Sequence, residues 1–113
     1  MQCVTLTAKG MHMSYVLTLV FEGVGEDQYW AVNDTLGMAG DWSQNWPAGM
    51  VDHSAGPTPN GWMVVERWES KAAHETFMAT RLGPALTKVS VRPPVHVFET
   101  VSINDKSRSA ANA

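Results

Sequence analysis

The sequence has little of the residue types that mark several large classes of protein. Cys3 is its only cysteine, which excludes an internal disulfide and metal sites built from several thiolates. Eight Lys and Arg, scattered along the chain, stand against eleven Asp and Glu, for a net charge of −3. Nucleic acid is therefore not an expected partner. No stretch approaches the ~18 apolar residues of a membrane span, and the N-terminal residues lack a secretory leader pattern. We expect a cytoplasmic protein with no membrane partner.

Apolar and bulky residues are plentiful by contrast. The 113 residues are 44% hydrophobic and include five Trp and seven Met, enough for one domain with a packed core. We expect this domain to span residues 13–103. Residues 1–12 are expected to be an N-terminal extension, either an added edge strand or a start that is not native, and residues 104–113 a solvated tail.

Hydrophobic periodicity and the positions of Gly and Pro predict a β-α-β-β-α-β order, an α+β fold of the ferredoxin-like type. The first helix is predicted to begin at the acidic pair Glu26 and Asp27 and to end at Gly37 and Gly40. Ser70 is expected to cap the second helix, which is interrupted at Gly83-Pro84 and continues through Leu86. The strands are expected at residues 15–22, 49–55, 62–68 and 95–101, with turn chemistry at residues 56–61.

Both faces of the predicted sheet carry apolar side chains. In the first strand, Tyr15, Leu17, Leu19 and Phe21 alternate with Val16 and Val20. The third strand sets Trp62, Val64 and Trp68 against Met63 and Val65. Two helices cover only one face of four antiparallel strands, so the other face needs a cover. We expect a homodimer paired through this face as a dimeric α/β barrel; the alternative is a monomer shielded by its N-terminal tail.

The middle of the chain resembles a known family. GWMVVERWESKAAHETFMATRLGPAL at residues 61–86, HSAGPTPNG at residues 53–61, and above all the Trp68-Glu69-Ser70 step are similar to the antibiotic biosynthesis monooxygenase-like family of the dimeric α/β-barrel superfamily. The resemblance covers about residues 13–103. It implies a four-stranded antiparallel sheet with two helices on one face, whereas activity stays open because this scaffold hosts many reactions.

The resemblance also bears on cofactors. Haem-degrading members carry a Trp and a His at the positions of Phe77 and Thr87, so haem is not expected. Cofactor-free oxygenases of the superfamily use a dry aromatic pocket that holds a phenolic or quinol anion. The chain has no glycine-rich phosphate loop and no metal-ligand spacing, and we expect no flavin, nicotinamide or metal.

Two residues are candidates for catalysis. His53 lies mid-strand with Val51 and Ala55, where a neutral imidazole suits a general base; the alternative is an imidazole bonded in the core or the dimer seam. Glu66 shares a face with Trp62 and would act as a second base if buried, although a surface carboxylate is the more common outcome at such a position.

Ligand contacts are expected from the tryptophans, because indoles offer flat stacking area. For Trp62 and Trp68 a core or interface role is the alternative, and Trp42 and Trp46 are expected to form a lid. We expect His74 to face solvent. A metal site from His53, Glu66 and His96 lacks supporting spacing. The candidate ligand residues are Trp30, Trp42, Trp46, Trp62 and Trp68.

Two hypotheses remain for function. The first is a cofactor-independent monooxygenase, or a related isomerase, acting on a small aromatic or polyketide-like compound. The second is a non-catalytic binding protein whose own side chains fill the barrel. An open pocket of several hundred Å³ beside His53 would favour the first.

Overall fold

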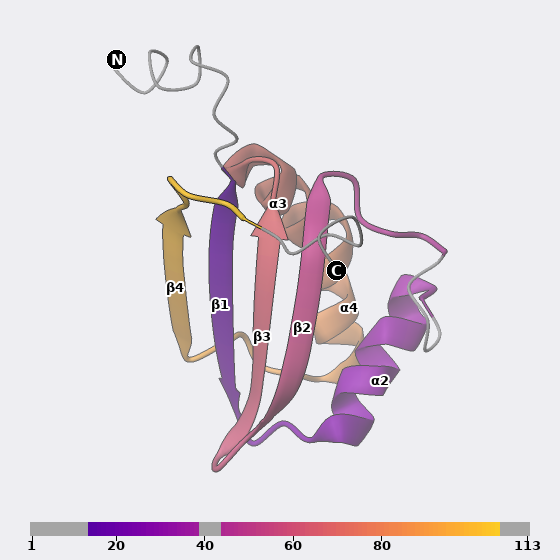
Figure 1. The fold of residues 1–113 in the computed structure, drawn as a ribbon. Helices are drawn as coiled ribbons and strands as arrows, with labels where there is room; N and C mark the ends of the chain where they lie inside the picture. Colours follow the sequence, from indigo (N-terminus) through magenta and orange to yellow (C-terminus); the bar gives the residue numbers. More distant parts are fainter. Residues whose placement is uncertain (1–13, 39–43, 107–113) are drawn as a thin grey trace, which may run out of the picture.

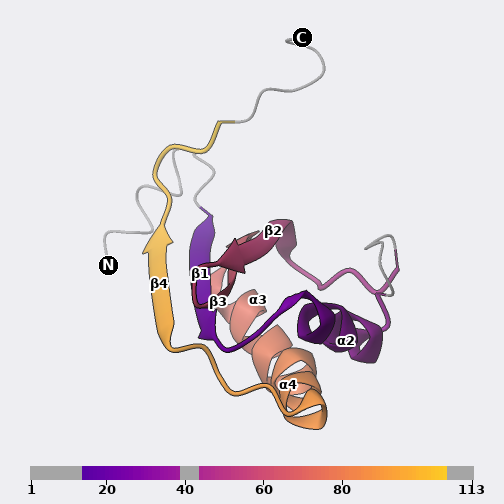
Figure 2. The same cartoon turned by 90° about the horizontal axis from the view of Figure 1, so that it is seen from below.

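The structure, a computed structural model, describes residues 14–38 and 44–106. The four strands form one antiparallel sheet in the order β2-β3-β1-β4. The helices lie together on one face of this sheet, and no helix of the described residues covers the other, which we call the bare face (Figures 1 and 2). This confirms the predicted βαββαβ fold. Its elements are β1 (Tyr15–Glu22), α2 (Glu26–Leu36), β2 (Met50–Thr58), β3 (Gly61–Trp68), α3 (Lys71–Phe77), the π-helical segment η1 (Met78–Leu82), α4 (Gly83–Val89) and β4 (His96–Val101).

Strand β1 lies between β3 and β4 and carries the centre of the core. Its burial alternates along the strand, with Leu17 and Leu19 almost completely buried under the helices. Val16 and Val20 point to the bare face and are only half-buried. The predicted alternation of two apolar sets is confirmed, and the bare face remains apolar.

Strand β4 extends the sheet past the region that the helices cover (Figure 1). All six of its residues are exposed, including Val97 and Phe98. The largest apolar exposures near it belong to Phe98 at 61% and Ile103 at 69%. This edge therefore adds to the uncovered apolar surface of the sheet.

The first helix, α2, begins and ends where the sequence predicts. Gln28 accepts a hydrogen bond from the backbone N–H of Gly25 (2.8 Å), and Gly37 ends the helix in the left-handed conformation at φ 82°. Gly40, the second expected stop, lies outside the described residues. Val32 and Asn33 are the buried residues of this helix, so its inner face combines apolar packing with one amide.

The second helix begins at Lys71, where the Ser70 hydroxyl accepts a hydrogen bond from the N–H of Ala73 (3.1 Å), as predicted. It continues through η1 into α4 without breaking. Pro84 provides no N–H, and the N–H of Gly83 reaches back five residues to the carbonyl of Met78. The interruption predicted at Gly83-Pro84 is thus a wider helical turn.

The second strand and its turn differ from the prediction. We expected a strand at 49–55 and a turn at 56–61, whereas β2 runs to Thr58 and pairs with β3 down to Thr58 opposite Gly61. Only Pro59 and Asn60 form the loop. The prolines and glycines that suggested a long turn are accommodated in an edge strand, where one missing N–H costs little.

A β-bulge interrupts β2 near its start. Met50 pairs with Trp68 and Asp52 with Arg67, so Val51 is the extra residue. Val51 is consequently 47% exposed, whereas Met50 is buried. The prediction that Val51 and His53 share a face is wrong because the bulge shifts the alternation by one residue.

His74 is buried in the core, with 8% of its surface exposed, so the prediction that it faces solvent is wrong. Its ring lies between those of Tyr15 (5.8 Å) and Trp68 (5.3 Å). Burial lowers the pKa of His74, while the charges of Glu66, Glu75 and Glu99 oppose this change. The imidazole is therefore held neutral inside the protein.

We predict that Gly61→Ala destabilises the protein by about 1–3 kcal/mol. A Cβ at this position would lie 2.0 Å from the carbonyl oxygen of Phe21 in the neighbouring strand, and backbone cannot move away as a flexible side chain could. The matched control is Gly56→Ala in β2, where a Cβ meets nothing within 4 Å. Urea unfolding measures both; equal effects of the two substitutions would contradict the close contact.

The burial of His74 predicts a loss of stability on the acid side. Its pKa lies below the ordinary value in the folded state, so below about pH 6.5 the unfolded chain takes up a proton that the folded chain does not. Stability from this group is complete above that pH and decreases as the pH falls. We expect the free energy of unfolding to decrease less between pH 7 and pH 5 in His74→Gln than in the unmodified protein. Parallel pH curves from urea titrations would show that His74 has no such role.

Candidate active site

Glu66 lies on the covered face of β3, and only 3% of its surface is exposed. The expectation that it is a surface residue is wrong. The alternation of β3 places it in one row with Trp62, Val64 and Trp68, all of them buried. A carboxylate in this position is costly unless both of its oxygens have partners.

Both oxygens of Glu66 do have partners. One oxygen accepts a hydrogen bond from the indole N–H of Trp68 at 3.0 Å. The other lies 3.1 Å from Nδ1 of His53. Trp68 itself is completely buried. The indole and the imidazole together hold the carboxylate in one orientation.

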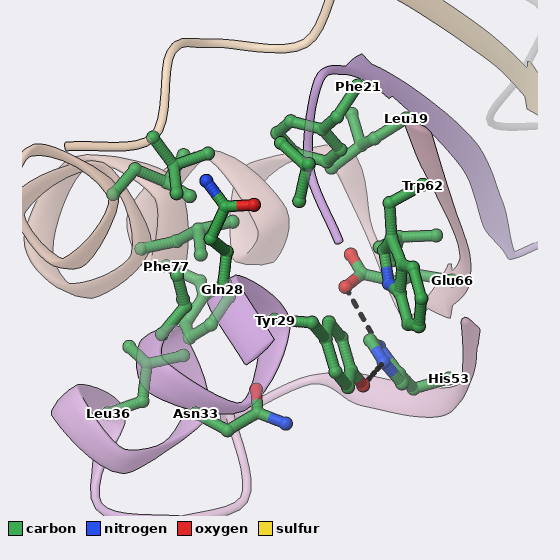
Figure 3. Close-up of a pocket in the computed structure, with 16 residues that line it drawn as sticks. Leu19, Phe21, Gln28, Tyr29, Asn33, Leu36, His53, Trp62, Glu66 and Phe77 are labelled. Atoms are coloured by element: carbon green, nitrogen blue, oxygen red, sulfur yellow. Dashed lines mark hydrogen bonds and ion pairs between the residues drawn. The ribbon is translucent and has the colours of Figure 1, made fainter. Parts of the chain in front are cut away.

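His53 faces Glu66 across the pairing of β2 and β3. The tautomer that fits both neighbours has Nδ1–H donating to the Glu66 carboxylate and Nε2 as an acceptor. The hydroxyl of Tyr29 donates to Nε2 at 2.6 Å. Figure 3 shows the resulting series from Glu66 through His53 to Tyr29 at the wall of a pocket. The arrangement presents Nε2 of the imidazole as a hydrogen-bond acceptor to an O–H group.

Tyr29, on the first helix, is not among the candidate residues that the sequence indicates. In the structure its ring lies 6.0 Å from the His53 ring and 5.2 Å from that of Trp62. Burial raises the pKa of the Tyr29 hydroxyl, the nearby Asn33 amide opposes this, and the charge of Glu66 adds to the increase. The hydroxyl therefore stays protonated and donates to His53. The spacing of residues in the sequence does not predict a contact between a helix and a distant strand.

The pocket lies between the sheet and the helices. Its cavity has a volume of about 50 Å³ within a hollow of about 510 Å³ that includes the open mouth. Most lining side chains are aliphatic or aromatic, and the polar ones are those of Gln28, Tyr29, Asn33, His53 and Glu66. A small apolar space with a few convergent polar groups is typical of a small-molecule site.

The four tryptophans within the described residues occupy different places. Trp62 lines the pocket, whereas Trp68 lies behind Glu66 in the core. Trp30 is 39% exposed and its indole donates to Glu26 (3.0 Å), and the indole of Trp46 donates to the carbonyl of Met50 (2.7 Å). Neither Trp30 nor Trp46 is among the residues that line the pocket. Trp42, the other expected lid residue, lies outside the described residues.

Of the remaining positions considered for metal or haem binding, Phe77 lines the pocket, whereas His96 and Thr87 do not. His96 is exposed on β4 and stacks on Phe98 at 5.9 Å. Within residues 14–38 and 44–106, no group of three or more His, Cys, Asp or Glu is placed to hold a metal ion. At the two positions compared with haem-degrading proteins, Phe77 packs against Trp68, and the Thr87 hydroxyl donates to the carbonyl of Gly83.

No helix in the described part of the chain is both long and apolar enough to cross a membrane.

The sequence matches no family model and no curated protein. Solved structures are similar in fold. A putative antibiotic biosynthesis monooxygenase from Chloroflexus aurantiacus matches over 84% of this chain and 97% of its own, with a TM-score of 0.54 and 15% sequence identity. The cofactor-independent oxygenase SnoaB from Streptomyces nogalater covers 84% and 94% (TM-score 0.49, 12% identity). A monooxygenase from Streptomyces coelicolor in complex with nanaomycin D covers 90% and 95% (TM-score 0.46, 15% identity).

The match to the Chloroflexus protein confirms the fold that the sequence resemblance implied. At this level of identity the likeness extends to the arrangement of strands and helices and leaves the activity to the chemistry of the site. The chain has the ferredoxin-like βαββαβ fold of the antibiotic biosynthesis monooxygenase-like proteins.

Proposed function

We propose that this protein binds a small aromatic molecule in the pocket beside His53 and oxidises it with dioxygen, without a cofactor. The observation that carries the proposal is the Glu66 and His53 pair at the pocket wall, with Nε2 of the imidazole turned toward a hydroxyl. The fold shared with a putative monooxygenase agrees with it.

In the proposed reaction, His53 removes the proton of an acidic hydroxyl on the substrate. The proton stays on Nε2, and the carboxylate of Glu66 stabilises the resulting imidazolium through Nδ1. The substrate anion is electron-rich and reduces dioxygen. At an activated CH₂ group the net change is the loss of two hydrogens, the gain of one oxygen atom and the release of one water.

The size of the cavity limits the ligand. An engineered cavity that binds benzene measures about 150 Å³, whereas this one measures about 50 Å³ within its larger open hollow. A one-ring ligand therefore has to displace the Tyr29 ring, which occupies the space beside His53 and Trp62. The hydroxyl of such a ligand would replace that of Tyr29 at Nε2 of His53.

The position of the Tyr29 ring also favours a second candidate function. Because the Tyr29 ring fills the space next to the imidazole, the protein can serve as a non-catalytic binder or a dimeric protein whose own side chains fill its interior. The two functions differ in whether a ligand displaces Tyr29 and is then turned over.

We further propose that two copies pair through the bare face of the sheet. That face carries the half-buried side chains of Val16, Val20 and Val65 and the exposed ones of Met63 and Phe98. An apolar surface of this kind on several adjacent strands is unusual for a monomer. Pairing of two sheets would cover it and leave the pockets, on the opposite face, with their linings intact.

For activity, we predict that His53→Ala lowers turnover by about a hundredfold or more, the usual effect of losing a general base. Glu66→Gln is expected to lower turnover less, since it removes the charge but keeps the shape. The measurement is oxygen uptake with a series of quinols and hydroxylated aromatics. His96→Ala, at an exposed position outside the pocket lining, is the matched control. If a substrate is turned over equally by all four proteins, the site assignment is wrong; if none is turned over, the non-catalytic function stands.

For assembly, light scattering at micromolar concentration is expected to give about twice the chain mass of 12.4 kDa. Val20→Asp should dissociate or unfold the protein, because an unpaired charge buried in the seam costs several kcal/mol. The control is Val97→Asp on β4, which is 50% exposed and faces away from the seam because it pairs with Leu19 of the covered face. A mass of one chain for the unmodified protein would refute the dimer.

A further inference from the structure

Two N–H donors in the pocket wall have no acceptor among the described residues. They are Nε1 of Trp62 and Nδ2 of Asn33, which is near the Tyr29 hydroxyl without a hydrogen bond to it, and both atoms are inaccessible to water. Trp62 is 7% exposed and Asn33 is 2% exposed. Buried polar groups in folded proteins almost always have partners, so two exceptions in one pocket need an explanation.

Both residues line the pocket that contains the Glu66 and His53 pair. Trp62 lies on β3, two residues before Val64 and in the same covered-face row as Val64 and Glu66. Asn33 lies on α2, one helical turn after Tyr29. Figure 3 shows them on different sides of the Tyr29 ring, with the Tyr29 hydroxyl at His53 between them. The two donors thus flank the position that a ligand would occupy once Tyr29 is displaced.

We propose that Trp62 and Asn33 bind uncharged acceptor oxygens of the ligand, so that the ligand class is small aromatic ketones. This rests on the proposed function only in placing the ligand in this pocket. The indole can only donate, and its N–H would bind the carbonyl oxygen. The amide of Asn33 would donate to the other lone pair of the same oxygen once the pocket opens.

The charges of the site select against other ligand classes. Glu66 supplies a negative charge, and no Lys or Arg is among the described residues that line the pocket. A carboxylate ligand would be repelled without compensation. An ammonium group would meet two N–H donors that cannot accept its protons. A hydrocarbon would fit the apolar walls but leave both donors without a partner. A neutral ketone satisfies the donors and the apolar lining together.

Binding requires the pocket to open, because both nitrogen atoms are covered. The Tyr29 ring lies 5.2 Å from that of Trp62, and its displacement would expose the indole edge. The unmet donors favour this change, since a bound carbonyl replaces an unsatisfied N–H by a hydrogen bond.

The test compares acetophenone with ethylbenzene, which has nearly the same shape but no acceptor oxygen. In the protein labelled with ¹⁵N at tryptophan, acetophenone should move one indole N–H resonance downfield, and Trp62→Phe should remove that resonance. Ethylbenzene should bind more weakly and leave the indole proton without a downfield shift. Trp62→Phe and Asn33→Leu should each weaken the affinity for acetophenone about fivefold to tenfold, the range for one hydrogen bond. The affinity for ethylbenzene should change little in both variants.

Three results would contradict the binding of a ketone by Trp62 and Asn33. Equal affinity for both compounds, an unshifted indole resonance, or failure of acetophenone to bind up to its solubility limit would overturn the proposal. Melting curves of the variants, with His53→Ala as a variant that keeps both donors, exclude loss of fold as the cause of weak binding. Because the readout is binding rather than oxygen uptake, a failed turnover assay leaves this result unaffected, and the reverse also holds.

Discussion

The buried carboxylate of Glu66 is the constraint on which the site depends. It is stable on the covered face because His53 and Trp68 occupy its two oxygens. That pairing requires the bulge at Val51. If the register that pairs Met50 with Trp68 continued without the extra residue, Asp52 would lie opposite Glu66 and His53 would turn to the bare face. One inserted residue thus replaces repulsion between two carboxylates with a hydrogen-bonded pair, and it points the imidazole into the pocket.

Alternate residues of the same strands face opposite sides of the sheet, and the two sides have different roles. On β3, Trp62, Val64 and Glu66 face the helices and line the pocket, whereas Met63 and Val65 face the bare side. The described lining comes from one chain, so the polar series from Glu66 to Tyr29 is complete without a second copy. The residues that would touch across the seam are not those that would touch a ligand. Pairing through the bare face would therefore affect the site only indirectly, by making the shared strands more rigid.

Local patterns predicted what local interactions determine. The alternation in β1, the Ser70 cap and the stop at Gly37 follow from periodicity and backbone chemistry, and His53 and Glu66 were both identified as candidates. The burial of His74 and Glu66, the hydrogen bond between Tyr29 and His53, and the bulge at Val51 were not predicted. These depend on which helix packs over which strand. A polar residue is buried when distant side chains supply its partners, and the spacing of residues within one element carries no information about them.

Tyr29 connects the resting protein to its proposed chemistry. It is a phenol held against the base, and burial together with the charge of Glu66 raises its pKa. A hydroxyl whose pKa is raised keeps its proton, so Tyr29 binds Nε2 of His53 through a hydrogen bond without transferring the proton to it. In the proposed reaction, a substrate hydroxyl would replace that of Tyr29 at Nε2, and an acidic phenol or enol would form the stronger hydrogen bond there, whereas an alcohol would not. Under the proposed function, competition with Tyr29 would therefore favour turnover of compounds whose hydroxyl is acidic enough to be ionised at His53.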